Sequence, residues 1–246
     1  MQEIDYTRYY RHWHDGSDEH FEKMAAGFAN KLKQFLPAEK STRVLEIGSG
    51  VGFAIGGLRK LGYEAVIGID SDRGQVAEAA RRRLPVDFVP TQQTRSYLEA
   101  RRGSFDVALC FDVLEHVPPA EQLIFLVAIR EALAPGGRFV CQVPNANAAV
   151  ASRYRYNDWT HHCSFSEHSL DFVLHNAGFT DIEVKEANPN TRPRLAFIPR
   201  LSVLLWLLRG MFRLIRRLEY ALDNIGWAEA KSIPLSANIV ATARRP

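Results

Sequence analysis

Short apolar runs alternate with helical segments along the middle of the chain, and this alternation constrains the fold more than any other feature. The runs read as buried strands, because each is short, rich in Val, Ile and Phe, and bounded by Gly, Pro or polar residues. They cover residues 43–48, 65–70, 86–90, 105–111 and 138–144. Two intervening helical segments end at glycines, residues 58–61 at Gly62 and residues 121–133 at APGG (134–137). This order predicts an α/β fold, a doubly wound sheet that binds ligands at the carboxyl ends of its strands.

Composition excludes several other classes of protein. Apolar residues make up 46% of the chain and charged residues 24%, which is typical of a globular protein. The formal net charge of +3 is too small to indicate nucleic acid as a partner. Cys110, Cys141 and Cys163 lie far apart and predict neither a disulfide framework nor a zinc finger. The first ten residues lack a basic segment followed by an apolar one, so a cytoplasmic location without a signal peptide is expected.

The first predicted strand ends in a glycine-rich turn, EIGSGVG (46–52). Glycines permit a tight turn and let backbone N–H groups approach a ligand closely. A dinucleotide fingerprint G-x-G-x-x-G is not formed, because Phe53 or Ile55 stands at the third glycine position. Glu46 would repel a pyrophosphate and attract a cation, while Asp70 ends the second strand where a carboxylate can hold both ribose hydroxyls. The two acids therefore predict a pocket for a cationic nucleoside such as a sulfonium.

Four motifs at their observed spacing resemble the class I S-adenosylmethionine-dependent methyltransferases, the broad branch that includes the ubiquinone-type O-methyltransferases. The motifs are VLEIGSGVG (44–52), GID (68–70), CFDVLEHV (110–117) and LAPGGRFV (133–140). The resemblance covers about residues 40–186. It implies a seven-stranded Rossmann-like sheet of order 3-2-1-4-5-7-6 with strand 7 antiparallel, closed by residues 178–187 and 236–245.

The same resemblance implies S-adenosylmethionine as the cofactor and gives a set of residues expected to contact it. That set is Glu46, Gly48, Ser49, Gly50, Gly52, Asp70, Gln92, Asp112 and Glu115. The chain departs from the family after the third strand, where an acid often meets the adenine amino group. Here the sequence is TQQT (91–94), and Gln92 or Gln93 can substitute.

After the fourth strand the chain has DVLEHV (112–117) instead of the N/D-P-P-Y/F motif that related families use to methylate planar amines. A hydroxyl acceptor is therefore expected, and its proton must be removed as the methyl group moves in line. His116 is a candidate base, because imidazole titrates near pH ~6.5. The alternative is that Asp112, Glu115 and His116 only contact the methionine part of the cofactor or cap the loop.

The stretch RYNDWTHHCSFSEHSL (155–170) follows the fifth strand and so lies on the ligand face. It leads into a helix predicted over residues 167–177 with Ser166 as its N-cap. The pattern around Asp158 and His161 resembles methyltransferases encoded for bacterial surface polysaccharides, which implies that His161 faces the acceptor. The catalytic candidates are His116, His161 and Asp158. Of the other two histidines, His162 is expected to be structural and His168 to be a surface residue.

Other side chains are candidates for holding the acceptor. Arg153, Arg155 and Tyr156 suit stacking on a sugar or gripping a phosphate, although a solvated loop explains them equally well. Tyr10 lies in the aromatic segment YTRYYRHW (6–13), which is expected either to close over the site as a lid with Tyr9 and Trp13 or to pack on the outside of the domain.

A divalent metal is possible but not expected. Asp112, Glu115, Asp158 and His161 offer suitable ligand atoms. However, no compact H-x-x-x-H spacing is present.

The expected organisation is a helical lid over residues 1–39, a cofactor domain over 40–187 and 236–246, and a helical insertion over 188–235. Apolar residues of the insertion share one side of a helix around residues 200–222: Val203, Leu204, Leu207, Met211, Leu214, Ile215, Leu218 and Leu222. Four arginines share the opposite side: Arg209, Arg213, Arg216 and Arg217. This basic amphipathic helix is too interrupted to span a bilayer. Its apolar side is expected to meet an anionic membrane, the domain itself or a second subunit.

These features predict an S-adenosylmethionine-dependent O-methyltransferase that acts on a sugar hydroxyl of a bacterial surface glycan, such as an O-antigen, or on its lipid-linked precursor. No nucleic acid partner is expected, whereas a homodimer and attachment to the inner face of the cytoplasmic membrane are possible. Two alternatives stay open. One is a quinone or small-phenol O-methyltransferase, and the other is a cofactor-binding scaffold without chemistry.

Overall fold

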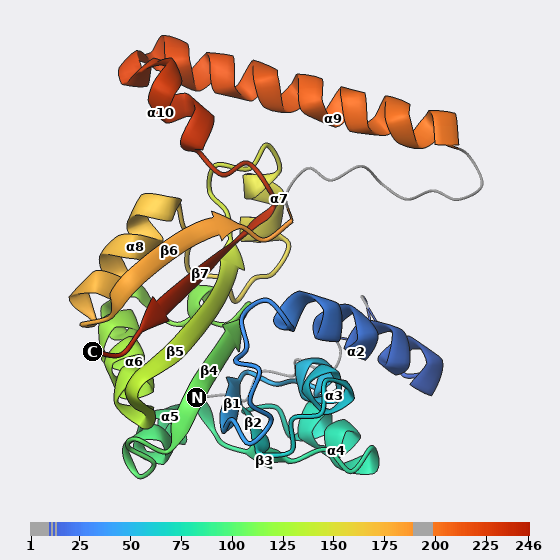
Figure 1. Ribbon diagram of the computed structural model, residues 1–246, viewed down its shortest axis with the longest axis vertical. Helices are drawn as coiled ribbons and strands as arrows, with labels where there is room; N and C mark the ends of the chain where they lie inside the picture. The colour runs from blue at the N-terminus through green and yellow to red at the C-terminus, as the bar shows by residue number, and fades with distance from the viewer. Residues whose placement is uncertain (1–9, 11, 13, 189–198) are drawn as a thin grey trace.

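The computed structural model describes residue 10, residue 12, residues 14–188 and residues 199–246, and its centre is a seven-stranded sheet (Figure 1). The strand order is β3-β2-β1-β4-β5-β7-β6, with β7 antiparallel to both of its neighbours, as expected. The strands are β1 (Val44–Ile47), β2 (Val66–Asp70), β3 (Val86–Phe88), β4 (Phe105–Phe111), β5 (Leu133–Pro144), β6 (Thr180–Glu186) and β7 (Asn238–Arg244). The predicted fold is therefore confirmed.

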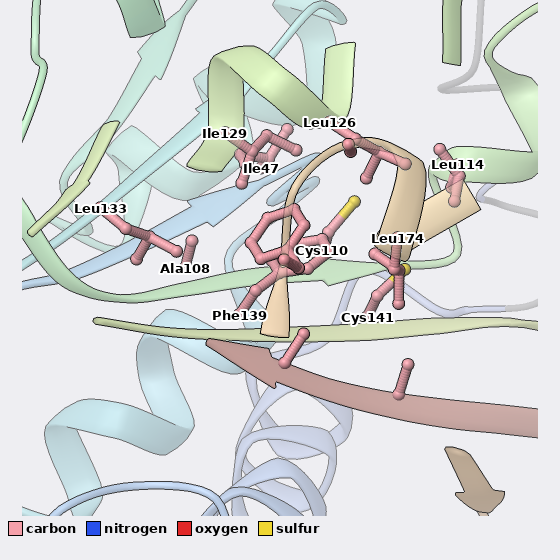
Figure 2. Close-up of a cluster of buried hydrophobic side chains, with 14 of the residues drawn as sticks. Ile47, Ala108, Cys110, Leu114, Leu126, Ile129, Leu133, Phe139, Cys141 and Leu174 are labelled. Atoms are coloured by element: carbon pink, nitrogen blue, oxygen red, sulfur yellow. The ribbon is translucent and has the colours of Figure 1, made fainter. Parts of the chain in front are cut away.

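Helices cover both faces of this sheet, and each face has its own buried core. One core joins α2, α3 and α4 to the sheet through residues such as Leu32, Ile55 and Ala79. The other joins α5, α6 and α8 to the opposite face, where Leu126 and Leu174 pack with Phe139 (Figure 2). These helices are α2 (Asp18–Leu32), α3 (Phe53–Lys60), α4 (Arg73–Arg81), α5 (Thr91–Glu99), α6 (Pro119–Ala132) and α8 (Glu167–Asn176). The apolar strands need this double cover because both of their faces are buried.

The boundary between α6 and β5 differs from the prediction. Residues 134–137 were expected to end a helix and precede a strand over 138–144, but β5 already begins at Leu133. Leu133 pairs with Phe105 of β4, and the ladder then shifts register before Val107 pairs with Arg138. Gly136 has a φ of 74°, so the irregular stretch needs a residue without a Cβ atom. Periodicity does not predict such an interruption inside a strand.

The insertion before β7 contains a long helix, α9 (Pro199–Tyr220), a π-helical turn, η2 (Ala221–Ile225), and a short helix, α10 (Gly226–Ser232). In Figure 1, α9 extends across the top of the molecule, apart from the sheet. Among the described residues, no helix is both long enough and apolar enough to cross a membrane. The helical insertion predicted before the last strand is therefore present.

Candidate active site

The glycine-rich turn after β1 is pressed against the turn that follows β4. Gly48, Gly50 and Gly52 all have positive φ angles, of 71°, 55° and 86°. A Cβ atom on Gly48 would lie 2.2 Å from Cγ2 of Val113, and one on Gly52 would lie 2.7 Å from Cδ1 of Leu84. Both the backbone conformation and the available space therefore require glycine here. The contact with Val113 also brings the segment 112–117 next to the predicted cofactor turn.

Asp70 closes over this turn from the end of β2. The backbone N–H of Gly50 donates to Asp70 Oδ2 at 2.7 Å, and that of Asp72 donates to Asp70 Oδ1 at 2.8 Å. Burial raises the pKa of the Asp70 carboxyl, and the two backbone donors oppose that rise. Asp70 is thus held beside the glycines, where a bound nucleoside can reach it.

Glu46 lies beneath the same turn and is 4% exposed. The hydroxyl of Ser49 donates to Glu46 Oε2 at 2.6 Å. Burial raises the pKa of Glu46 to about 8, with the Ser49 hydrogen bond acting in the opposite direction. A buried acid with so high a pKa would favour a cation nearby, because the cation would stabilise its ionised form.

Lys31 of α2 joins the site, although no motif in the sequence predicts it. Its ammonium donates to Gln142 Oε1 at 2.5 Å and lies 4.3 Å from the centre of the Phe111 ring. Burial lowers the pKa of Lys31, while the charges of Asp112 and Glu46 raise it. Asp112 itself is exposed and accepts two hydrogen bonds from Gln142 Nε2, at 3.0 and 2.9 Å. A cation and an acid thus meet at the carboxyl ends of β4 and β5.

Glu115 is the most unusual group in the site. It lies in the short 3-10 helix η1 (Leu114–His116) and is 0% exposed, yet neither carboxylate oxygen has a hydrogen-bond partner among the described residues. Burial raises the pKa of Glu115 well above its usual value, and the nearby charge of Asp112 raises it further. A buried carboxylate without a partner is costly, which makes it a candidate functional group.

Two histidines from distant parts of the chain meet beside Glu115. The rings of His116 and His161 have centroids 4.6 Å apart and an interplanar angle of 70°. His161 Nδ1 lies 2.8 Å from the carbonyl oxygen of Tyr154, which can only accept, so Nδ1 carries a proton. In the neutral ring the lone pair is therefore on Nε2. That atom lies 4.0 Å from Glu115 Oε1 and 4.0 Å from Asp158 Oδ2.

Asp158 orients the second histidine through Thr160. The Thr160 hydroxyl donates to Asp158 Oδ1 at 2.6 Å, and its oxygen lies 2.8 Å from His116 Nδ1. Because the single hydroxyl proton points to Asp158, the Thr160 oxygen accepts from His116 Nδ1. Burial, together with the charge of His161, lowers the pKa of His116 to about 4. His116 is therefore a neutral but weak base at neutral pH.

Glu115, His116 and His161 could hold a divalent cation. Each offers a ligand atom, and these atoms lie within 4.8 Å of one another. Two imidazoles and a carboxylate suit zinc, manganese or iron better than magnesium. The unpartnered Glu115 oxygens fit this interpretation, because a cation would neutralise them.

The remaining predicted residues lie farther from this cluster. Gln92 is exposed in the first turn of α5, where a cavity is lined by Gln93 instead. The ring centroid of Tyr10 lies 6.1 Å from that of Phe53, which begins α3 directly after the glycine turn. Burial raises the pKa of the Tyr10 hydroxyl to about 12. Tyr9 and Trp13 lie outside the described residues.

The predicted acceptor residues lie on α7 (Ala151–Tyr156), which precedes the histidine loop. Arg155 donates to the carbonyl oxygen of His162 at 2.7 Å and so helps fix the loop. Arg153 and Tyr156 are exposed, the latter by 75%. The side chain of His168 is exposed, as expected, and that of His162, which was expected to be structural, is exposed as well.

Comparison with known proteins decides the family. A model of the methyltransferase-domain family matches residues 19–184, well over half of the chain. The chain belongs to this family. Its fold is shared by the crystal structure of an S-adenosylmethionine-dependent methyltransferase from Archaeoglobus fulgidus, with a TM-score of 0.63, 19% identity, and coverage of 89% of this chain and 94% of that one. The predicted class, an S-adenosylmethionine-dependent methyltransferase, is confirmed at this level.

Two relatives carry a more specific name, ubiquinone biosynthesis O-methyltransferase. The protein from Cereibacter sphaeroides is 37% identical over 136 residues, covering 51% of this chain and 50% of the relative. The protein from Dinoroseobacter shibae is 33% identical over 180 residues, covering 66% of this methyltransferase and 69% of the relative. The chain thus spans about half the length of several curated relatives that it matches.

These relatives correct the predicted acceptor. A sugar hydroxyl of a surface glycan, or of its lipid-linked precursor, is the wrong expectation, because the similar proteins are named for ubiquinone biosynthesis. The error came from the loop around Asp158 and His161, whose pattern of residues was taken as a sign of a glycan. A Thr and two histidines near an acid can serve any hydroxyl acceptor, so that pattern does not identify a sugar.

Proposed function

We propose that this methyltransferase transfers a methyl group to a hydroxyl of a quinol or catechol ring. The observation that carries the proposal is the cluster of Glu115, His116 and His161, which stands beside the cofactor turn and offers a base for a hydroxyl proton. The names of the relatives support a quinone precursor as the acceptor.

Residues of the glycine turn fit S-adenosylmethionine. Gly48 and Gly52 have no room for a side chain, so a ligand can come close to the backbone of the turn, while Asp70, held by the N–H of Gly50, is positioned for the ribose hydroxyls. Glu46 would favour the sulfonium cation, and the Lys31 ammonium suits the carboxylate of the methionine part. When bound, S-adenosylmethionine supplies a methyl group that is already activated on sulfur. The protein therefore has to align the acceptor and remove one proton.

His161 is the better candidate for taking that proton. The bond between the acceptor oxygen and the methyl carbon forms as the carbon–sulfur bond breaks, and the hydroxyl proton passes to His161 Nε2. The carboxyls of Glu115 and Asp158, each 4.0 Å away, would stabilise the resulting imidazolium. His116, with a pKa of about 4, is too weak a base and instead positions the ring of His161.

A methylation assay tests this assignment. Purified protein is incubated with S-adenosylmethionine and a hydroxyquinol that carries a short isoprenoid chain, and the methylated product is measured. We expect His161→Asn to lower kcat by about 10²-fold or more while cofactor affinity stays within about twofold. The matched control is His168→Asn, because that histidine is exposed on α8 and should leave kcat unchanged.

Two outcomes would count against the proposal. If His161→Asn retains full activity, the base is elsewhere. If the parent protein binds the cofactor but methylates none of the ring hydroxyls offered, the scaffold without chemistry is favoured.

A quinol with an isoprenoid chain is lipid-soluble, so we also propose that the enzyme works at a membrane surface.

A further inference from the structure

The long helix α9 turns its apolar side away from the rest of the protein. Six apolar side chains define this outer face, and between 46% and 64% of each is exposed: Leu204, Leu207, Met211, Phe212, Ile215 and Leu218. Apart from the adjacent Met211 and Phe212, they follow one another every three or four residues, so they form one continuous stripe along the helix. The sequence left open whether this stripe packs on the domain. In the described structure it does not.

Polar contacts on the opposite side of α9 fix this orientation. Arg213 forms an ion pair with Glu186 at the end of β6, and the hydroxyl of Tyr220 lies 3.5 Å from the carbonyl oxygen of Asn147. Ser202 is buried, with 3% of its surface exposed. Arg216 stacks on Tyr220, with its guanidinium carbon 4.8 Å from the ring centre. The side of α9 that carries Ser202, Arg213 and Tyr220 therefore faces the domain, and the outer face is what the helix presents to its surroundings.

A stripe of this size requires a partner. Single exposed apolar residues are ordinary, but a contiguous apolar patch rimmed by polar residues marks a site of protein or membrane interaction. The 22 residues of α9 extend for about 33 Å at 1.5 Å per residue. Without a partner, the apolar outer face would be exposed to water along the whole of that length.

Charge distinguishes between the two kinds of partner. Residues 199–232 contain six Lys and Arg and three Asp and Glu, which gives +3. The formal net charge of the whole chain is also +3, so the rest of the chain balances to zero. Two copies of such a segment would repel each other, whereas an anionic surface would attract it. Trp227 of α10 is 44% exposed and adds an amphipathic ring of the kind that favours a membrane–water interface.

We propose that the outer face of α9 docks on an anionic lipid bilayer, with its apolar side chains inserted among the headgroups and upper acyl chains. The helix lies parallel to the surface, and its arginines stay at headgroup level between the bilayer and the domain. The polar side reaches the active-site region through Asn147, which lies between β5 and α7, and through Glu186. Docking therefore brings the acceptor side of the enzyme to the membrane. This last consequence rests on the proposed lipid-soluble acceptor, whereas the docking itself does not.

Vesicle co-sedimentation of the full chain tests the docking. The probes are vesicles of phosphatidylcholine alone and of phosphatidylcholine with phosphatidylglycerol. Phe212→Glu on the outer face is compared with Phe172→Glu on α8, since both phenylalanines are 64% exposed. We expect the parent and Phe172→Glu to bind the anionic vesicles equally, and Phe212→Glu to bind on the order of 100-fold more weakly. Both variants should unfold at the temperature of the parent, because neither side chain is buried.

Salt and oligomeric state complete the test. Raising the ionic strength should weaken binding of the parent to anionic vesicles, because the arginines are screened over about 10 Å. Equal losses for Phe172→Glu and Phe212→Glu, or no binding of the parent to anionic vesicles at low salt, would overturn the proposal. So would a parent dimer that dissociates in Phe212→Glu, since a second copy would then occupy the face. Because the readout is binding, its failure is separate from any failure of the methylation assay.

Discussion

The buried carboxyl of Glu115 should lower the free energy of unfolding of the protein. Replacing Glu115 with methionine should therefore stabilise the protein, and it should also abolish activity. The carboxyl is 0% exposed and neither oxygen has a partner among the described residues. Each unit by which burial raises its pKa corresponds to about 1.4 kcal/mol lost when the group ionises in the folded state. Replacing buried ionised groups by apolar ones of similar volume is often neutral or stabilising by about 1–4 kcal/mol. We therefore expect Glu115→Met to raise the free energy of unfolding by about 1–3 kcal/mol at pH 8.

The pH dependence of this gain has a definite sign. Since the pKa of Glu115 is raised in the folded protein, the folded state holds the proton more tightly than the unfolded chain does. The parent should lose stability relative to the variant as the pH rises above the unfolded value near 4.5, and the difference should vanish below it. For a chain of this size each kcal/mol corresponds to about 2–4 °C in Tm.

Thermal unfolding at pH 4 and pH 8 measures the gain in stability and its dependence on pH. EDTA is present so that no cation neutralises the carboxylate. The matched control is Glu121→Met, whose parent side chain is exposed in the first turn of α6. Its Tm should change little, apart from a few tenths of a kcal/mol of helix-dipole interaction. A Glu115→Met protein that is less stable than the parent at pH 8, or that keeps its methylation rate, would refute the reasoning.

Three further predictions concern the cofactor and the cluster. Asp70→Asn should raise the Kd for S-adenosylmethionine by about 10-fold or more in calorimetry, because a hydrogen bond to a charged group is worth about 1.5–3 kcal/mol; an unchanged Kd would remove Asp70 from the site. The Kd should also fall between pH 7 and pH 9, since the Glu46 pKa of about 8 means that a bound sulfonium must displace a proton, and Glu46→Gln should flatten that profile. Methylation should persist in EDTA, because a cation held by Glu115, His116 and His161 would occupy the Nε2 atom that is proposed as the base; loss of activity in EDTA with recovery on adding zinc or manganese would instead make this cluster a cation site.

Features set by local sequence were predictable, and features set by packing between distant segments were not. The glycine turn and Asp70 were found because their backbone demands and their position at strand ends leave a pattern in the sequence. Lys31 was missed because its partner Gln142 is 111 residues away, and only the placement of α2 against the sheet brings the two together. The role of Glu115 was seen only in part, since its missing hydrogen-bond partners are a property of the folded surroundings.

The orientation of helix α9 is a second feature that the sequence alone does not predict. Its two faces follow from a period of 3.6 residues, so the sequence shows that they exist. Which face turns outward depends on contacts such as the ion pair of Arg213 with Glu186 and the approach of Tyr220 to Asn147. The sequence therefore left open what the apolar side meets, whereas the structure turns that side outward and keeps two of the arginines in contact with other side chains.

The family match and the docking helix occupy different parts of the chain, and this separates what the relatives can support. The match ends at residue 184, so it includes the glycine turn, Glu115 and the histidine loop but not α9. The family match therefore covers the cluster proposed for the chemistry and does not reach the helix proposed to meet the membrane. Since α9 contacts the segment after β5 that leads to His161, a change in what covers its outer face could alter access to the acceptor without changing the chemical groups. Methylation of a water-soluble quinol should then tolerate Phe212→Glu, while methylation of a long-chain quinol in vesicles should not.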